Sequence, residues 1–245
     1  MTETDPDGSS RQALLGMLSG ERYNIRDGIP LLLDQQAVSG LNRRYQAMYN
    51  RVARLYDPAL RLLAFIMGGS EQRFRQEYLQ RLGVSAGWRV LEVSVGTGAN
   101  LRSLPPDATY FGLDISWGML SRCRHNLHRW HREAELFLGN AEELPFVDAS
   151  FDAVLHVGGI NAFSDRGRAL AEMARVARSG ARLLVADETS KALEALSWSP
   201  TARRLLQQHR DRFAPPVSLL PAGMLDVQVT SILRGWLYCI TWVKP

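Results

Sequence analysis

The stretch that decides the fold is Val90-Leu91-Glu92-Val93-Ser94-Val95-Gly96-Thr97-Gly98-Ala99-Asn100. Its mostly apolar start predicts a short buried strand at Val90–Val93, and the two glycines predict a tight turn directly after it. Ligands of open α/β sheets bind beyond the carboxyl ends of such strands. Because glycine has no side chain, a ligand can approach the backbone closely at Gly96 and Gly98.

The spacing of the turn indicates which ligand it suits. A dinucleotide-binding turn has the pattern G-x-G-x-x-G, with a pyrophosphate at the helix N-terminus. Here the pattern is Ser94-x-Gly96-x-Gly98, and position 101 is leucine. Glu92 lies directly before the turn, where a carboxylate would repel a pyrophosphate but suits a cationic amino group. The turn therefore favours S-adenosylmethionine over NAD.

Three further pieces with polar residues accompany predicted strands. Asp114 ends the strand Tyr110–Leu113, about 20 residues after Glu92, the distance at which a carboxylate accepts hydrogen bonds from ribose hydroxyls. Segment 139–146 follows a third strand, and segment 151–159 contains a fourth. Any one of these pieces could be an ordinary polar turn, but all four in this order predict one binding site.

From Arg89 onward, short apolar strands alternate with helices, which indicates a parallel sheet covered on both faces. The chain ends differently, because Leu225–Ile232 and Trp236–Val243 are joined by a short turn and predict an antiparallel hairpin. The other predicted elements are strands Leu136–Leu138, Asp152–Val157 and Leu183–Ala186, and helices Met119–Arg132 and Gly167–Ala177.

The segment before the sheet predicts a helical lid over residues 41–82. Apolar residues recur at helical spacing from Leu41 to Tyr56, and a second helix is predicted from Glu71 to Leu82. Tyr49 and Tyr56 fall on one face of the first helix. A site that excludes water needs a cover, so we expect this helix to lie over the ligand, although it could instead be an ordinary packing helix.

Composition restricts the class of protein. With 245 residues, 46% of them hydrophobic, the chain can bury the core of one larger domain. It has neither a signal-peptide pattern nor an apolar run near the roughly 20 residues that span a bilayer, so we expect a cytoplasmic protein. Cys123 and Cys239 are not spaced as zinc ligands and predict neither a disulfide framework nor a metal site.

Positive charge is concentrated before the sheet. Between Gly40 and Val90 the chain has nine arginines and three acidic residues. Such basic helices can attract an anionic substrate, a membrane surface or nucleic acid, or they can simply be solvated faces. The sequence indicates no oligomeric state.

At these residues the sequence resembles the class I S-adenosylmethionine-dependent methyltransferases, most closely the branch of ubiquinone/menaquinone C-methyltransferases (methyltransferase type 11). The resemblance covers about Tyr45 to Pro245 and includes Tyr49–Asp57 and the closing Trp242–Pro245. It implies a Rossmann-like sheet of seven strands, mostly parallel with an antiparallel C-terminal hairpin strand, and with helices on both faces. The domain would span 41–245, after a tail and lead-in at 1–40.

The resemblance also implies the positions that bind S-adenosylmethionine: its methionine part near Glu92, its ribose at Asp114 and its adenine at Asn140. The complete expected set is Tyr49, Tyr56, Glu92, Ser94, Gly96, Thr97, Gly98, Asn100, Asp114, Ile115, Met119, Asn140, Ala141, Glu142, Val157 and Gly158. Two positions depart from the family, which usually has glycine at Ser94 and aspartate at Asn140. Residues 22–33 resemble the end of a zinc-ribbon-like lead-in, but its cysteines are absent, so we expect no metal.

The chemistry of methyl transfer asks little of the protein beyond alignment and exclusion of water. A general base is needed only where the acceptor must lose a proton, and His156 is the best-placed candidate, ahead of Asp187 and Glu188. The alternative for His156 is a buried packing residue.

The nature of the acceptor stays open among three possibilities. The first is a small or lipid-like molecule, quinone-like or amphipathic, because the expected cover is aromatic and basic; its basic helices could also contact a membrane. The second is rRNA or tRNA. Nucleic acid is disfavoured because segment 156–159 lacks the Asn/Asp-Pro-Pro-aromatic motif of amino methyltransferases, and no cysteine follows a proline. The third is cofactor binding without turnover.

Overall fold

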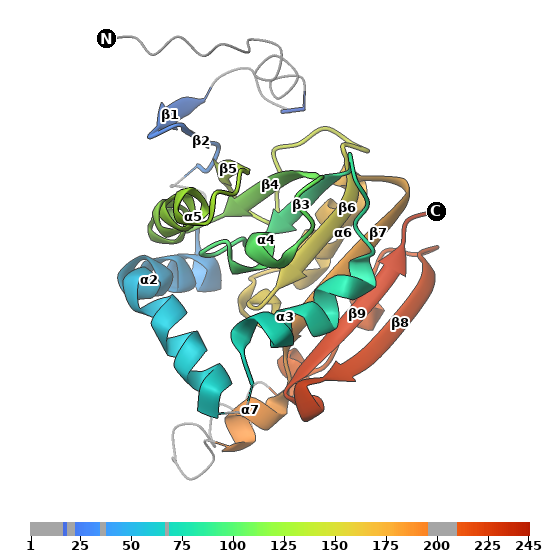
Figure 1. Cartoon of the computed structure of the whole chain (residues 1–245). Coiled ribbons are helices and arrows are strands. Elements are labelled where there is room, and N and C mark those ends of the chain that lie inside the picture. The colour runs from blue at the N-terminus through green and yellow to red at the C-terminus, as the bar shows by residue number, and fades with distance from the viewer. Residues whose placement is uncertain (1–16, 19–22, 35–37, 67–68, 196–209) are drawn as a thin grey trace, which may run out of the picture.

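A computed structural model of the protein describes residues 17–18, 23–34, 38–66, 69–195 and 210–245, and the structural statements below concern these residues (Figure 1). The predicted tail at 1–10 lies outside them. The described strands form one sheet in the order β1-β2-β5-β4-β3-β6-β7-β9-β8. Their bounds are β1 (Asn24–Arg26), β2 (Ile29–Leu31), β3 (Arg89–Val93), β4 (Thr109–Asp114), β5 (Glu135–Leu138), β6 (Phe151–Val157), β7 (Ala177–Glu188), β8 (Leu225–Ile232) and β9 (Leu237–Val243).

The expected seven strands are present as the run from β5 to β8, and the fold class is confirmed. Strands β2, β5, β4, β3, β6 and β7 run parallel to one another. Strand β9 runs antiparallel between β7 and β8, as predicted for a C-terminal hairpin. The described sheet has nine strands rather than seven. The two additional strands, β1 and β2, form a hairpin, and Leu31 pairs with Leu138 of β5.

The extra hairpin has a local cause. Asp27 and Gly28 both have positive φ, 52° and 78°, as a two-residue turn between antiparallel strands requires. The turn signal was visible in the sequence, but the pairing of such a short strand with β5 was not. Part of the lead-in therefore belongs to the sheet, although the boundary at residue 40 stays a prediction.

The described helices are α2 (Gly40–Ile66), α3 (Glu71–Leu79), α4 (Ala99–Ser103), α5 (Trp117–Trp130), α6 (Arg166–Val176) and α7 (Ser190–Ala195). Helix α2 runs ten residues beyond the predicted end and continues through Pro58. Helices α5 and α6 are capped at their N-termini by Ser116 and Asp165, whose side chains accept hydrogen bonds from the N–H groups of Met119 and Arg168. None of the helices that the structure describes is long and apolar enough to span a membrane.

Two hydrophobic clusters lie on the two faces of the sheet. Alternate strand residues belong to different clusters: Leu91 packs with Leu170 and other residues of α6, whereas Val90 packs with Leu120 and further residues of α3, α4 and α5. Figure 1 shows α6 on one face and α3 and α4 on the other. Both faces are thus covered, so the carboxyl ends of the central strands are left as the place for a site.

Candidate functional site

A partly open cavity lies beyond the carboxyl ends of β3, β4, β5 and β6. It is lined from these strand ends on one side and from α2 and α3 on the other. The predicted cofactor residues that line it are Tyr49, Tyr56, Glu92, Ser94, Gly96, Thr97, Asn100, Asp114, Ile115, Met119, Asn140, Ala141, Val157 and Gly158. The four polar segments that were predicted to form one binding site therefore meet at one cavity.

The turn after β3 depends on left-handed backbone conformations. Gly96 and Gly98 have φ of 56° and 79°, and a Cβ on Gly98 would lie 2.7 Å from Sγ of Cys123. Ser94 also has a positive φ, 59°. This conformation costs a non-glycine residue about 1–2 kcal/mol, which explains physically why glycine is usual at this position.

Glu92 lines the cavity with a buried carboxyl group. Its Oε1 accepts a hydrogen bond from Nδ2 of Asn100 at 2.5 Å, and its Oε2 has no hydrogen-bond partner among the described residues. Burial raises the pKa of Glu92 from 4.5 to about 8, against the hydrogen bond from Asn100 and the charge of Arg75, which lower it. An acceptor oxygen buried without a partner fits a cationic amino group, because such a group would both donate to Oε2 and neutralise the charge.

Arg75 and Tyr78, which were not among the predicted site residues, orient Asn100. Nη1 of Arg75 and the hydroxyl of Tyr78 donate to Oδ1 of Asn100 at 2.7 and 2.8 Å. With both donors on Oδ1, the amide directs its Nδ2 at Glu92. Arg75 is itself held by Glu71, to which its Nη2 donates at 2.6 Å. These residues come from α3, and no motif at α3 would have indicated the contact.

Asp114 lies at the end of β4 and accepts two backbone hydrogen bonds. Gly96 N–H donates to Oδ2 at 2.9 Å, and Ser116 N–H donates to Oδ1 at 2.8 Å. Burial raises the pKa of Asp114 to about 6, although these hydrogen bonds lower it. Each oxygen keeps a further lone pair, so the carboxylate can also accept from two neighbouring hydroxyls such as those of a ribose.

Helix α2 is held over this cavity by side chains on its inner face. Oδ1 of Asn50 accepts from the Ser116 hydroxyl at 2.7 Å and from Gly118 N–H at 2.8 Å. Nε2 of Gln46 donates to the carbonyl of Ile115 at 2.9 Å. All three contacts are made to the residues directly after β4, so the helix is fixed next to the carboxylate of Asp114.

Asp57 makes a second connection from α2. Its Oδ1 accepts from the Thr97 hydroxyl, and its Oδ2 accepts from Nδ2 of Asn126 at 2.9 Å. Asn126 also donates to the carbonyl of Thr97 at 3.0 Å. The hydroxyl predicted to face the cofactor is therefore bonded to the covering helix. Asp57 belongs to a segment that the resemblance included, but the sequence did not indicate its partner.

Comparison with known proteins agrees with this geometry. Residues 91–185 match the family described as methyltransferase domain. A demethylmenaquinone methyltransferase of Mycobacterium sp. (strain KMS) is 31% identical over 191 residues, covering 78% of this chain and 77% of the relative. A ubiquinone/menaquinone biosynthesis C-methyltransferase of Geobacter sp. (strain M21) is 31% identical over 163 residues, covering 64% and 68%.

The chain belongs to the class I S-adenosylmethionine-dependent methyltransferases. Within them it is similar to the ubiquinone/menaquinone branch, as the sequence predicted. The fold agrees, since a putative S-adenosylmethionine-dependent methyltransferase from Methanococcus maripaludis superposes with a TM-score of 0.60 at 15% identity, covering 86% of this chain and 97% of that one.

Three residues expected at the site of the methyltransferase do not line the cavity. Gly98 packs against α5 at Cys123. Glu142 instead holds α2 and α6, because its Oε1 accepts from Nδ2 of Asn42 at 2.9 Å and from Asp165 N–H at 3.0 Å. His156 is the third residue. That the predicted set binds cofactor stays a prediction for each member.

His156 is fully buried within the sheet of the methyltransferase. Its Nδ1 lies 3.0 Å from the carbonyl oxygen of Val93, and its Nε2 has no partner among the described residues. Burial lowers its pKa, so the ring is neutral. Phe163, which does line the cavity, packs edge-to-face on the imidazole with centroids 5.0 Å apart. This environment corresponds to the packing alternative, and the catalytic role stays an untested prediction.

The tyrosines of α2 form the aromatic wall of the methyltransferase cavity. Tyr45, Tyr49 and Tyr56 all line it, with ring centroids 6.3 Å apart for the first pair and 6.1 Å for Tyr49 and Tyr56. Burial raises the pKa of Tyr49 well above its usual range and that of Tyr56 to about 12. Both hydroxyls are therefore neutral at physiological pH and can donate hydrogen bonds.

Proposed function

We propose that this methyltransferase methylates a small, lipid-like acceptor with a flat quinol ring. The observation that carries the proposal is the aromatic wall of Tyr45, Tyr49, Tyr56 and Phe163, which lines the same cavity as Glu92 and Asp114. Flat aromatic side chains bind a ring by stacking and edge contacts while excluding water. The activities by which the relatives are named, demethylmenaquinone and ubiquinone/menaquinone methyltransferase, support a quinone-type acceptor.

In this proposal the residues at the ends of β3 and β4 hold S-adenosylmethionine. Glu92 accepts from its amino group, because Oε2 is buried without a partner. Asp114 accepts from the ribose hydroxyls, and the glycines of the turn allow close approach. When bound, S-adenosylmethionine supplies an electrophilic methyl group. The protein's part is to align the acceptor with that methyl group and to keep water out.

The acceptor must be the nucleophile in this displacement, so the reduced, electron-rich quinol fits and the electrophilic quinone does not. A ring carbon forms the new bond to the methyl carbon, the bond from sulfur to methyl breaks, and the ring then loses a proton to regain aromaticity. Tyr49 and Tyr56 can donate hydrogen bonds to the quinol oxygens from the covering helix. With neutral hydroxyls they orient the ring without adding charge beside the sulfonium.

Transfer from radiolabelled S-adenosylmethionine to organic-extractable material tests this proposal. The full chain is incubated with a reduced short-chain 2-prenyl-1,4-naphthoquinol, and the product is analysed by mass spectrometry. We expect addition of one methyl group to a ring carbon, and a lower rate for Asp114→Ala at limiting S-adenosylmethionine. Label that enters added rRNA or tRNA but not the quinol would overturn the proposal in favour of RNA methylation. Tight binding of S-adenosylhomocysteine with no transfer would favour binding without turnover.

A further inference from the structure

The outer side of α2 presents an exposed apolar stripe. Its residues recur at intervals of four, three, four, three and four, which places them along one line of a helix. The side chains of Leu55, Leu62 and Ile66 are 72%, 60% and 70% exposed, and the neighbouring Phe65 is 76% exposed. The complete stripe is Met48, Val52, Leu55, Ala59, Leu62 and Ile66, and all six side chains are exposed.

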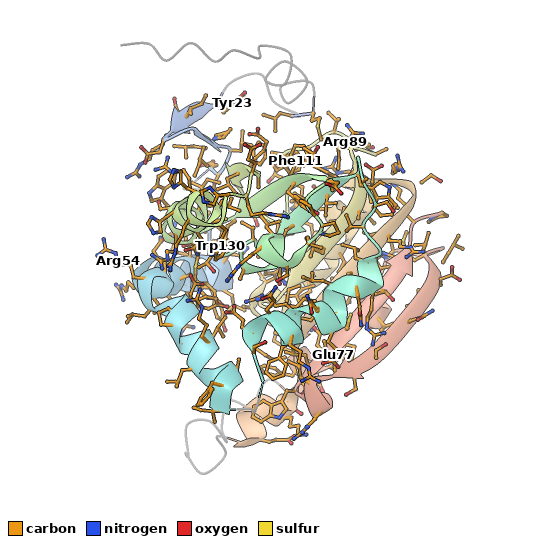
Figure 2. All side chains as sticks on the ribbon, in the orientation of Figure 1. Tyr23, Arg54, Glu77, Arg89, Phe111 and Trp130 are labelled. Carbon is orange, nitrogen blue, oxygen red and sulfur yellow. The ribbon has the colours of Figure 1, made fainter. Side chains whose placement is uncertain are left out.

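Arginines flank the stripe. Arg44 and Arg51 lie close to its line and Arg54 beside it, and all are exposed, as are Arg43 and Arg61. Figure 2 shows Arg54 pointing outward from α2, away from the sheet. Among the described residues, only Arg61 of these five has an ion-pair partner, Glu71 at 3.6 Å. The lone acidic residue of α2, Asp57, is buried on the opposite side.

We propose that α2 docks the methyltransferase onto an anionic lipid surface. Its stripe would enter the boundary between headgroups and acyl chains, and its arginines would bind lipid phosphates. A helix with an apolar line, a basic flank and no exposed acidic residue is complementary to such a surface. Exposed leucine and phenylalanine side chains grouped on one helix are otherwise costly in water.

A second copy of the chain is the competing occupant, because intervals of four and three also suit helix pairing. Charge argues against it. Two copies of α2 packed through this stripe would bring arginines of one helix beside arginines of the other, with no exposed carboxylate on either helix to pair with them. An anionic membrane avoids this repulsion, because its phosphates pair with the arginines and its acyl chains contact the apolar stripe.

The stripe also lies next to the cavity wall. Leu55 precedes Tyr56 and Met48 precedes Tyr49, so the tyrosine row borders the stripe on the same helix. A docked α2 would therefore have one side on the membrane and the adjoining side on the cavity. A lipid-like acceptor would pass between them along the tyrosines. This route rests on the proposed function, whereas the docking itself does not.

Co-sedimentation with vesicles tests the docking. The full chain is mixed with vesicles of phosphatidylcholine alone or with about one third phosphatidylglycerol. We expect binding to the anionic vesicles that weakens with salt. Leu55→Glu with Leu62→Glu should reduce the partition coefficient at least about tenfold, because two buried leucines are lost. The control, Leu225→Glu with Val229→Glu, changes two half-exposed apolar residues of the edge strand β8 and should bind like the parent.

A charge-matched pair examines the arginines. Arg51→Glu with Arg54→Glu should lower anionic-vesicle binding at least about tenfold, since each basic residue near the surface contributes. Arg81→Glu with Arg168→Glu makes the same change in net charge on η1 (Gln80–Leu82) and α6 and should have a small effect. Equal loss in both pairs would reduce the effect to net charge and overturn the proposal.

Two further outcomes overturn it: no binding to anionic vesicles by the parent, or a dimer in solution that Leu55→Glu with Leu62→Glu dissociates. Binding of S-adenosylhomocysteine, measured on the same preparations without vesicles, should be unchanged in all four variants. A parent that binds vesicles but transfers no methyl group to the quinol would refute the proposed acceptor and leave the docking intact.

Discussion

Replacing Glu92 by glutamine should stabilise the free protein at high pH and weaken its hold on the cofactor. The carboxyl group is buried, and its pKa rises from the ordinary 4.5 to about 8. The folded protein therefore keeps a proton that the unfolded chain releases. The stabilisation that this proton gives is complete below pH 4.5 and is lost as the pH rises through about 8.

The size of the effect follows from the two pKa values. Each tenfold change in proton affinity corresponds to about 1.36 kcal/mol, so the difference between 4.5 and about 8 amounts to roughly 5 kcal/mol. Asp114 adds a change of the same sign, because its pKa also rises, to about 6. Comparing the parent with Glu92→Gln at the same pH removes the contribution of Asp114 and isolates that of Glu92.

Cofactor binding should change in the opposite direction. An ammonium group beside Oε2 favours the ionised carboxylate, so at pH 7 binding should release a proton and affinity should rise with pH up to about 8. Glutamine cannot supply this charge. Loss of one buried, charge-assisted hydrogen bond costs about 2–3 kcal/mol, a decrease in affinity of roughly 30- to 150-fold.

Two assays check this reasoning. Chemical denaturation of the cofactor-free protein at pH 6 and pH 9 should show a smaller loss of stability for Glu92→Gln than for the parent. Calorimetry with S-adenosylhomocysteine in buffers of different ionisation enthalpy should detect proton release by the parent only. A variant that binds S-adenosylhomocysteine within threefold of the parent would show that Glu92 does not contact the amino group. Equal pH dependence of both proteins would refute the assigned pKa.

Four further predictions concern the turn, the ribose site and the covering helix. Ser94→Gly should raise the free energy of unfolding by roughly 0.5–1 kcal/mol, because relief of the left-handed strain exceeds the entropy cost of glycine; equal or lower stability in urea denaturation would refute this. Asp114→Ala should weaken binding of S-adenosylhomocysteine by about 1.5–3 kcal/mol in calorimetry, and a folded variant with parental affinity would refute the ribose assignment. Gly118→Ala places a Cβ 2.9 Å from the backbone of α2 and should lower cofactor affinity. The control is Gly167→Ala on α6, where the new Cβ makes only an ordinary contact; it should leave affinity unchanged and stabilise its helix by about 0.5–1 kcal/mol. Equal affinities in the two variants would contradict the close packing of α2. In hydrogen exchange, peptides from 41–57 should gain protection when S-adenosylhomocysteine is added, and protection that is already complete without it would make α2 a fixed element rather than a lid.

The part of the site that the sequence predicted is the part built from strand ends. Parallel strands of one sheet bring their carboxyl ends to the same edge, so Glu92, Asp114 and Asn140 had to meet once three strands were correctly placed. Chain order and strand position were enough for this, and no side-chain detail was needed. The fold class was predicted from the alternation of strands and helices after Arg89, because that alternation favours a parallel sheet covered on both faces.

The hydrogen-bond partners of the site's side chains could not be predicted from the sequence. Thr97 was expected at the cofactor, yet its hydroxyl donates to Asp57, 40 residues away on α2. Glu142 was expected there too, yet it holds Asn42 of the same helix. Such contacts depend on the angle at which a helix crosses the strand ends, and neither periodicity nor spacing along the chain determines that angle.

The same limit applies to His156, for which the sequence left two roles open. Successive side chains of a strand point to opposite faces of the sheet, and His156 lies near the end of its strand, so its side chain could face either the cavity or the core. In the structure Phe163 lies at the cavity and the imidazole lies behind it, against the carbonyl of Val93. If the quinol proposal holds, the proton lost by the ring carbon has no imidazole to receive it directly. Aromatisation of a methylated quinol ring is strongly favourable, and a water molecule or the acceptor's own oxygen can carry that proton. Alignment by the tyrosines of α2 and exclusion of bulk water would then contribute to catalysis without help from His156.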